Sequence, residues 1–461
     1  MSIDISEEVR ATHADLSPAA LDFLSYVAAD PEARARPLPL PRLPPWVKAY
    51  PMQAWPILLG AAKARQIEED TVGVVRLVKS VPERIFGNDA KRLDLYYRLG
   101  DERTTALRFA PPTGLAGAIA RCDFLDTPSG PKVVEINSGP TVGGWEMRYL
   151  AEHYRRAPVL ARFFAERGLE PVARDSWSVF FRHVAEEVRS VQDVPEGEIN
   201  VALVTPETDT SRLAVAMAHF TDVYREALSG LGLTGRILAA FYPGTFAFEG
   251  GTRLTLEGVR VHALIEYTEQ ATPEDVYRCF KAGELHLYNG PLSRVLGDKR
   301  NLALLSEHAE SGLFSAEERA LIARCIPWSR AVEDRAVTWQ GDEVPLFDLL
   351  RRERLRFVLK PGTGLNGDHV VVGPRVAPEV WEQTLARAAA EGTWVAQEAV
   401  TSRPYLGQAG EVGAMPHEVV WGTFCFGERY GGGFLRMMPC GTGDGVINSA
   451  RGAVEGLLFE V

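Results

Sequence analysis

The sequence predicts a mixed α/β (α+β) protein, and three observations indicate this class. Apolar residues follow helical spacing through much of the first hundred residues, strands alternate with helices between about 195 and 297, and extended runs dominate the last hundred. With 461 residues in total and roughly 150 residues per domain, the chain is long enough for about three domains. Its 46% apolar and 24% charged residues are typical of a globular core and surface.

The first segment, residues 1–100, is predicted to be a helical N-terminal region. Ser17 caps a helix that starts at Pro18, and helical spacing returns from Trp55 to Lys79. Between these helices, residues 37–46 include five prolines. So many prolines exclude a helix or a central strand, which predicts a rigid surface connector.

Three further segments follow, with different patterns. Residues 101–194 begin with the extended runs ALRFA, AIARCDFLD and KVVEIN and continue with two helices. Residues 195–297 alternate strands with helices, which predicts a small α/β domain. Residues 298–461 begin with helices and continue with strands such as RFVLK and WVAQEAV, which predict a mixed antiparallel sheet.

The run ARCDFLDTPSGPKVVEIN predicts a hairpin with a three-residue loop, Pro128–Gly130. Centring the loop on Ser129 places Asp123 opposite Glu135 and Arg121 opposite Asn137. Because side chains alternate along a strand, these four polar residues share one face. The other face is apolar and carries Cys122, Phe124, Val134 and Ile136.

Two carboxylates directly opposite each other repel unless a cation lies between them. The oxygen ligands of Asp123, Glu135 and Asn137 suit Mg²⁺ or Mn²⁺ and do not suit zinc. Arg121 beside them could hold a phosphate oxygen. The alternative interpretation is a hairpin with a solvated charged face.

A second candidate site follows the strand that ends in Lys360. The glycines of the next loop, Gly362, Gly364 and Gly367, could lay backbone N–H groups over a triphosphate while the lysine reaches its oxygens. This loop is not a Walker A motif, because no helix and no Gly-Lys-Ser/Thr follow. The alternative is an ordinary glycine turn after a solvated lysine.

Three weaker signals flank this loop. Gln397 and Glu398 lie near the end of a strand, where main-chain groups could contact an adenine edge. Asp298 is predicted to cap a helix with Lys299 and Arg300 in its first turn, where cations oppose the helix dipole and either need an anion or are simply exposed. Near the C-terminus, Arg436 and Asn448 lie in a glycine-rich stretch and are candidate site residues. The alternative interpretation of this stretch is a loop-rich terminal hairpin.

Composition excludes several function classes. The chain has 50 Lys+Arg against 61 Asp+Glu, a net charge of −11, so we expect no nucleic-acid partner. Its five cysteines are scattered and never form a CxxC pair, which argues against a disulfide framework or a thiolate zinc site. The acidic N-terminus and the absence of a long apolar run argue against secretion and membrane insertion. We therefore expect a cytoplasmic protein.

These motifs together resemble the circularly permuted ATP-grasp ligases, typified by the synthetase domain of glutathionylspermidine synthase. That family has Arg-x-Asp on one strand and Glu-x-Asn twelve positions after the Asp, as at Arg121-x-Asp123 and Glu135-x-Asn137 here. In unpermuted ATP-grasp enzymes the lysine strand precedes Glu-x-Asn. Here Lys360 follows it, which only the permuted branch explains.

The resemblance implies a fold and a role for each motif. Residues 101–194 and 298–461 would form the ATP-grasp module, with 195–297 as an inserted pre-ATP-grasp-like domain. Two magnesium ions, or Mn²⁺, would bind to Asp123, Glu135 and Asn137. Arg121 would contact the transferred phosphate and Arg436 would steady an acyl phosphate. ATP would bind to Lys299, Lys360, Gly362, Gly364, Gly367, Gln397 and Glu398.

The resemblance also implies an activity. The chain would be an ATP-dependent carboxylate–amine ligase that joins amino acids, small peptides or amines through an acyl phosphate and releases ADP and phosphate. Its partners would be ATP, a small carboxylate and an amine acceptor, and relatives suggest a homodimer. Two alternatives remain open: a small-molecule kinase that uses the same ATP site, and a catalytically silent ATP-binding protein.

Overall fold

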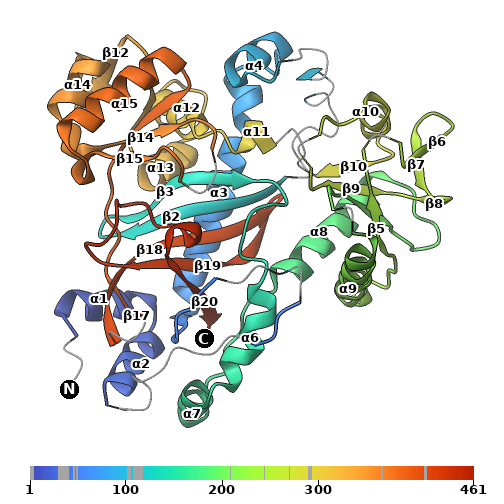
Figure 1. Cartoon of the computed structure of the whole chain (residues 1–461), viewed down its shortest axis with the longest axis horizontal. Coiled ribbons are helices and arrows are strands. Elements are labelled where there is room, and N and C mark those ends of the chain that lie inside the picture. The colour runs from blue at the N-terminus through green and yellow to red at the C-terminus, as the bar shows by residue number, and fades with distance from the viewer. Residues whose placement is uncertain are drawn as a thin grey trace.

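The structure of the chain is a computed structural model, drawn in Figure 1. The part of the chain that it describes is residues 5–29, 41–44, 47, 50–100, 105–106, 109, 118–207, 209–242, 244–268, 270–288, 293–364, 367–409 and 413–461. A central sheet carries a second antiparallel module on one side and an α/β unit on the other (Figure 1). No helix in the described part is both long and apolar enough to cross a bilayer.

The central sheet has seven strands from both ends of the chain. In spatial order these are β1 (Ile57–Leu59), β20 (Val454–Glu460), β19 (Arg429–Pro439), β18 (Gly413–Phe426), β2 (Ile119–Thr127) and β3 (Gly130–Ser138), with β17 (Tyr405–Ala409) paired to β18. Strands β1 and β20 are parallel, and the other pairs are antiparallel. Thus β1, from within the predicted helical region 1–100, completes the same sheet as the hairpin of candidate residues.

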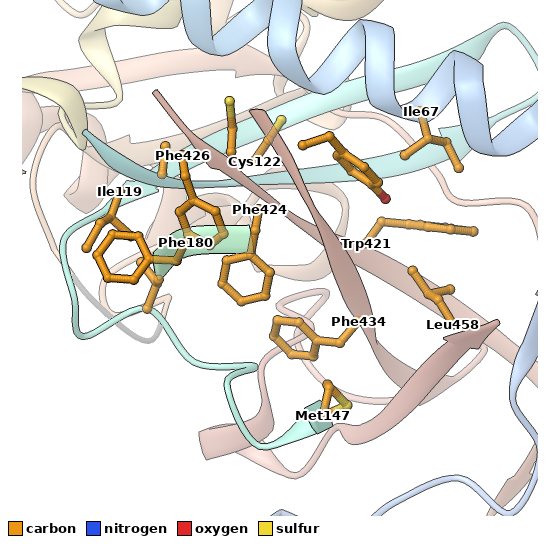
Figure 2. Close-up of a cluster of buried hydrophobic side chains, with 14 of the residues drawn as sticks. Ile67, Ile119, Cys122, Met147, Phe180, Trp421, Phe424, Phe426, Phe434 and Leu458 are labelled. Atoms are coloured by element: carbon orange, nitrogen blue, oxygen red, sulfur yellow. The ribbon is translucent and has the colours of Figure 1, made fainter. Parts of the chain in front are cut away.

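Helices cover both faces of this sheet. Those that contact its strands are α1 (Glu7–Leu16), α2 (Pro18–Ala29), α3 (Ala61–Arg84), α6 (Met147–Arg156) and α8 (Ser176–Val191). Helix α7 (Pro158–Arg167) packs on α6, and α4 (Ala90–Tyr97) follows α3 in the chain. Figure 2 shows Ile67 of α3 on one side of the strands and Met147 and Phe180 on the other, around Trp421 and Phe434. Aromatic residues from distant parts of the chain therefore build one core under the candidate site.

The N-terminal region agrees with its sequence pattern in part. Helix α2 begins at Pro18 as predicted, and the Ser17 hydroxyl accepts a hydrogen bond from the Ala20 N–H at 2.9 Å. The helix predicted from Trp55 is wrong over its first residues, because the apolar run Ile57–Leu59 pairs with β20 as a strand. Within the connector predicted at 37–46, residues 37–40 and 45–46 lie outside the described part of the chain.

The extended run predicted at 106–110 is also wrong where it can be checked. Ala106 and Phe109 are helical, while residues 107–108 and 110 lie outside the described part. A five-residue apolar run does not distinguish a strand from a buried helix by periodicity alone.

The hairpin of β2 and β3 has the predicted register at its polar residues. Arg121 pairs with Asn137 and Asp123 pairs with Glu135. The predicted three-residue loop is wrong, because Gly130 already pairs with Thr127 and leaves a two-residue turn. A bulge beyond Asp123 leaves Val134 unpaired and restores the register. Consequently Val133, and not Val134 as predicted, is the buried valine.

The α/β unit (residues 201–288) is built on a four-stranded parallel sheet. In spatial order its strands are β10 (His286–Tyr288), β9 (Ala263–Glu266), β4 (Val201–Val204) and β5 (Ile237–Ala240). The unit also contains α9 (Thr210–Ser229), α10 (Glu274–Lys281) and the small sheet β6 (Ala247–Glu249), β7 (Arg253–Leu256) and β8 (Val259–Arg260). The predicted alternation of strands and helices is confirmed, and α8 packs against α9 to join this unit to the central sheet.

The second antiparallel module, here called the 299–398 module, has a core of its own. Its main sheet has the order β11 (Ser329–Ala331), β16 (Trp394–Glu398), β14 (Phe357–Pro361) and β15 (Val371–Val372), and β12 (Ala336–Trp339) pairs with β13 (Asp342–Pro345). Its helices are α12 (Arg300–His308), α13 (Ala316–Cys325), α14 (Leu346–Arg352) and α15 (Pro378–Glu391), with short turns η2 (Arg354–Arg356) and η3 (Gly373–Arg375). The short helix α11 (Ser293–Leu296) precedes it, and η5 (Ser449–Arg451) lies near the C-terminus. Phe357, Trp381 and Trp394 fill this core. Helices α12 and α13 instead pack against α3 and join the core of the central sheet, so they connect the module to the hairpin.

Candidate functional site

The polar face of the β2–β3 hairpin holds a buried ion cluster centred on Asp123. The Arg121 guanidinium donates to both oxygens of Asp123, from Nε at 2.8 Å and from Nη2 at 3.0 Å. Nη2 of Arg436, on β19, lies 2.7 Å from Asp123 Oδ2. Burial disfavours the charged form of Arg121, but Asp123 holds the pKa of Arg121 above its usual value.

Glu135 has a different set of partners. The Asn137 amide donates to Glu135 Oε1 at 3.1 Å and to Asp123 Oδ2 at 2.8 Å, so it connects the two carboxylates. Lys299 Nζ lies 3.3 Å from Glu135 Oε2. Burial would raise the pKa of Glu135, but the ammonium groups of Lys299 and Lys360 outweigh burial and hold this pKa well below its usual range.

Lys360 extends from β14 of the 299–398 module to the hairpin. Its Nζ donates to the carbonyl of the bulged residue Val134 at 3.1 Å and to Gln397 Oε1 at 2.7 Å. Burial lowers the pKa of Lys360 to about 8, and Glu135 opposes that effect. The bulge that restored the register therefore also supplies an acceptor for the lysine.

The positive charges of Lys299 and Arg300, at the start of helix α12, are balanced by carboxylates of the protein itself. Asp298 Oδ1 accepts a hydrogen bond from the Arg300 N–H at 2.9 Å, and Arg300 Nη2 lies 2.6 Å from Asp298 Oδ2. Helix α12 begins at Arg300, one residue later than predicted. Because Arg300 is satisfied in this way, Lys299 alone extends from this turn to the hairpin.

The three glycines of the predicted phosphate loop differ in their surroundings. The Gly362 N–H donates to the Thr393 carbonyl at 2.7 Å, and a Cβ there would come within 2.6 Å of the same oxygen. Gly362 is thus explained by close packing, and its N–H is not open to a phosphate. The Gly364 carbonyl accepts a hydrogen bond from Lys299 Nζ at 3.3 Å. Gly367 has a φ of +70° and packs against Val446 of the C-terminal loop.

The groups of Gln397 and Glu398 predicted to contact adenine already have hydrogen-bond partners within the protein. The side chain of Gln397 is buried and binds Lys360 and, from Nε2 at 3.2 Å, Ser329 Oγ. The main-chain N–H of Glu398 donates to the Trp328 carbonyl at 2.8 Å, and the Glu398 carboxylate lies 3.0 Å from Arg356. Gln397 therefore orients the lysine here, and an adenine contact at this strand stays a prediction.

A cavity of about 340 Å³, here called the first cavity, opens beside these residues. Of the residues predicted from the sequence, its wall includes Arg121, Glu135, Asn137, Gly364 and Arg436. Asp123 is 1% exposed and lies behind the two arginines, outside the wall. The buried Nε of Arg436 has no hydrogen-bond partner among the described residues, which suits an incoming anion.

Several residues of this wall carry no recognisable signal in the sequence. Arg294, Thr363, Ser449 and Glu455 all line the first cavity, and Asn448 lines it beside them. A glutamate in the alternating strand β20 carries no local signal of a site. Only its pairing opposite Arg436 reveals it.

Glu455 belongs to a second carboxyl pair. Glu455 is 2% exposed, lies close enough to Glu146 for the two carboxyls to interact, and accepts a hydrogen bond from Ser449 Oγ at 2.7 Å. Burial and the neighbouring Glu146 raise the pKa of Glu455 to about 9. At neutral pH this pair therefore holds a proton.

The donor chemistry of the hairpin fits a divalent cation in part. Glu135 and Asn137 present a carboxylate and an amide to the first cavity, and both are oxygen ligands of the kind that Mg²⁺ prefers. Within the described ranges there is no group of three His, Cys, Asp or Glu side chains that could hold a metal. Asp123 instead balances two guanidinium groups, so its predicted metal role would require these groups to move.

Comparison with known proteins agrees with this fold. No protein-family model and no curated protein matches the chain. Among solved structures, a glutathione synthetase-like effector from Globodera pallida, in its apo form, superposes with a TM-score of 0.56 at 12% identity, covering 90% of this chain and 91% of that one. A putative γ-glutamylcysteine synthetase from Methylobacillus flagellatus KT covers 84% of this chain and 88% of that one at 13% identity, with a TM-score of only 0.38.

The first of these likenesses shows the fold alone. It confirms the mixed α/β class that the sequence predicted, and the ATP-grasp assignment stays a prediction. The circular permutation, the four segment boundaries and the link to glutathionylspermidine synthase stay predictions.

Proposed function

We propose that this chain is an ATP-dependent carboxylate–amine ligase that forms an amide through an acyl phosphate. The observation that carries the proposal is the convergence of cations from two modules on the hairpin that forms one wall of the first cavity. Arg121 and Arg436 of the central sheet line this cavity. Lys299 and Lys360 of the 299–398 module lie outside the wall and contact the hairpin at Glu135 and at the Val134 carbonyl. The likeness of the fold to a synthetase-like protein agrees with it.

The chemistry requires positioning and charge neutralisation and needs no side-chain nucleophile. A substrate carboxylate would attack the γ-phosphate of ATP, which releases ADP. An amine would then displace phosphate and form the amide. Arg436, whose buried Nε lacks a partner among the described residues, would bind the phosphoryl oxygens together with Lys360.

Glu135 and Asn137 would hold Mg²⁺ at the first cavity. A bound magnesium ion supplies neutralisation of the phosphate charge. In the ligand-free arrangement Lys299 balances Glu135, so we expect this lysine to turn to the phosphates when ATP binds. The glycine loop before Gly367 would then exclude water from the acyl phosphate, which otherwise hydrolyses.

The proposal is tested by incubating the protein with ATP, Mg²⁺, hydroxylamine and a panel of amino acids and short peptides. An acyl phosphate reacts with hydroxylamine to give a hydroxamate, which mass spectrometry identifies, and ADP appears with it. A phosphorylated product without hydroxamate would identify a small-molecule kinase instead. The absence of ADP across the panel would favour a catalytically silent protein.

The matched variants are Glu135→Gln and Glu428→Gln. Glu428 pairs with Arg76 at the surface, where its side chain is 54% exposed. We expect at least a hundredfold loss of hydroxamate for Glu135→Gln, of the size of a lost transition-state charge contact, and none for Glu428→Gln. Retained turnover in Glu135→Gln would exclude the metal assignment.

A further inference from the structure

A second cavity of about 480 Å³ adjoins the first. The two share the wall residues Tyr50, Thr141, Val142 and Gly143. The second cavity lies between the central sheet and the α/β unit, where α8 and α9 pack together. Its volume is in the usual range for small-molecule sites.

The wall of this second cavity is mainly aromatic and aliphatic. The Trp145 and Trp177 rings lie 4.6 Å apart between centroids, and Trp177 lies 5.1 Å from Phe220. Leu213 and Met217 of α9 add aliphatic surface. Figure 2 shows Phe180, another wall residue, between the sheet and α8. Burial of a large apolar ligand group against such a wall is favourable, because it removes apolar surface from water.

A pair of carboxyl groups lies between the two cavities. Glu146 lines the second cavity and Glu455 lines the first, and the two carboxyls interact. Both side chains belong to buried residues, 7% and 2% exposed. A second carboxylate brought here would be repelled, whereas an ammonium group would be attracted.

We infer that the second cavity binds the amine substrate, and that this substrate is a primary amine with an aromatic or large aliphatic group whose ammonium lies beside Glu146. This inference rests on the proposed ligase function and adds the class of the acceptor. An amine in the second cavity would lie next to the acyl phosphate, which would form in the first cavity. The two cavities meet at the shared residues Thr141 and Gly143.

The first experiment compares amines with the carboxylate that is most active in the hydroxylamine assay. We expect kcat/KM for phenylethylamine or tryptamine to exceed that for methylamine by about 10- to 100-fold, the factor that burying one aromatic group gives. Equal values for aromatic amines and methylamine, with hydroxamate still formed, would overturn the inference and leave the ligase function standing. A preference for aromatic carboxylates in place of aromatic amines would overturn it too.

A matched pair of variants on α9 tests the location. Ala216 lines the second cavity and is 7% exposed, whereas its neighbour Val215 is 59% exposed. Ala216→Phe fills the cavity and should remove the preference for aromatic amines while hydroxamate formation persists. Val215→Phe should keep that preference. An unchanged preference in Ala216→Phe would exclude this cavity as the site.

A binding measurement keeps the inference testable if Ala216→Phe does not fold or if no turnover is found. Because Trp145 and Trp177 lie in the wall, a saturable change in tryptophan fluorescence on titration with cyclohexylethylamine, the non-fluorescent saturated analogue of phenylethylamine, reports occupancy. We expect saturation in the wild-type chain and a dissociation constant at least tenfold weaker in Glu146→Gln. No saturable change in the wild-type chain would overturn the inference without any bearing on ATP chemistry.

Discussion

Asp123 and Glu135 face each other across one hairpin, yet different regions of the molecule balance their charges. Asp123 is held by Arg121 and Arg436, which belong to the same central sheet. Glu135 is held by Lys299, which comes from the 299–398 module, and Lys360 of that module lies close enough to lower its pKa. One carboxylate is therefore neutralised within a single sheet and the other across a junction between modules.

This difference separates a structural part of the site from a responsive part. Asp123, which is 1% exposed, has both guanidinium partners on the central sheet, so its charge is balanced whatever the position of the 299–398 module. The Glu135 cluster faces the first cavity and depends on the position of the 299–398 module. We expect changes at Asp123 to act mainly on stability and changes at Glu135 mainly on ligand binding.

The largest expected effect is that of Asp123→Asn. This change removes the charge that compensates two buried guanidinium groups, and breaking a buried ion pair costs about 3–5 kcal/mol. Urea unfolding followed by tryptophan fluorescence should show this loss in the free energy of unfolding. A loss below about 1 kcal/mol would mean that the arginines find other partners and would remove the distinction between the two regions.

Glu135→Gln should be less destabilising, by about 1–2 kcal/mol. Lys299 and Lys360 keep the carbonyls of Gly364 and Val134 as acceptors, so neither lysine is left without a partner. The same urea experiment checks this value. If Glu135→Gln unfolds as easily as Asp123→Asn, the module junction is as structural as the sheet.

The raised pKa of Glu455 predicts how the stability of the protein depends on pH. This pKa is raised to about 9 by burial and by Glu146, against the effect of Arg436. Between the ordinary carboxyl pKa and 9 the folded state binds more protons than the unfolded state, so stability falls as pH rises through this window. We expect a slope of up to about 1.4 kcal/mol per pH unit near pH 7 and a flatter slope in Glu455→Gln. Identical slopes would show that Glu455 is ionised in the folded protein.

The smallest expected effect is that of Arg76→Gln. Arg76 and Glu428 form a pair 2.8 Å apart whose side chains are both more than half exposed. Exposed pairs contribute about 0–1 kcal/mol, and salt screens them. The free energy of unfolding of Arg76→Gln should lie within about 1 kcal/mol of the wild-type value. The difference between the two proteins should not grow in 0.5 M NaCl, because salt screens the pair. A larger loss would show that the contribution of an ion pair to stability in this chain does not depend on how deeply the pair is buried.

The sequence predicted the hairpin register and the residues of its polar face, because alternation along two strands is a local property. It predicted Lys360 and Gln397 individually, but not that they bind each other, since that contact depends on how β14 and β16 pair. Gly362 was assigned to phosphate binding because glycine patterns do not distinguish an open N–H from close packing. Glu146 and Glu455 were missed because they are remote in the chain and meet only in the folded sheet.

The bulge at Val134 makes the distance between the turn and the site adjustable. One residue removed at Pro128–Ser129 could be absorbed by straightening the bulge, because Phe124 would then pair with Val134, a two-residue turn would remain, and Asp123 would still face Glu135. The unpaired carbonyl that Lys360 now uses would then return to the ladder. Turn length in this hairpin is thus coupled to the docking of a module more than two hundred residues away in the chain. Natural length variation at this turn would therefore be selected through that contact, while the spacing of the carboxylates would stay the same.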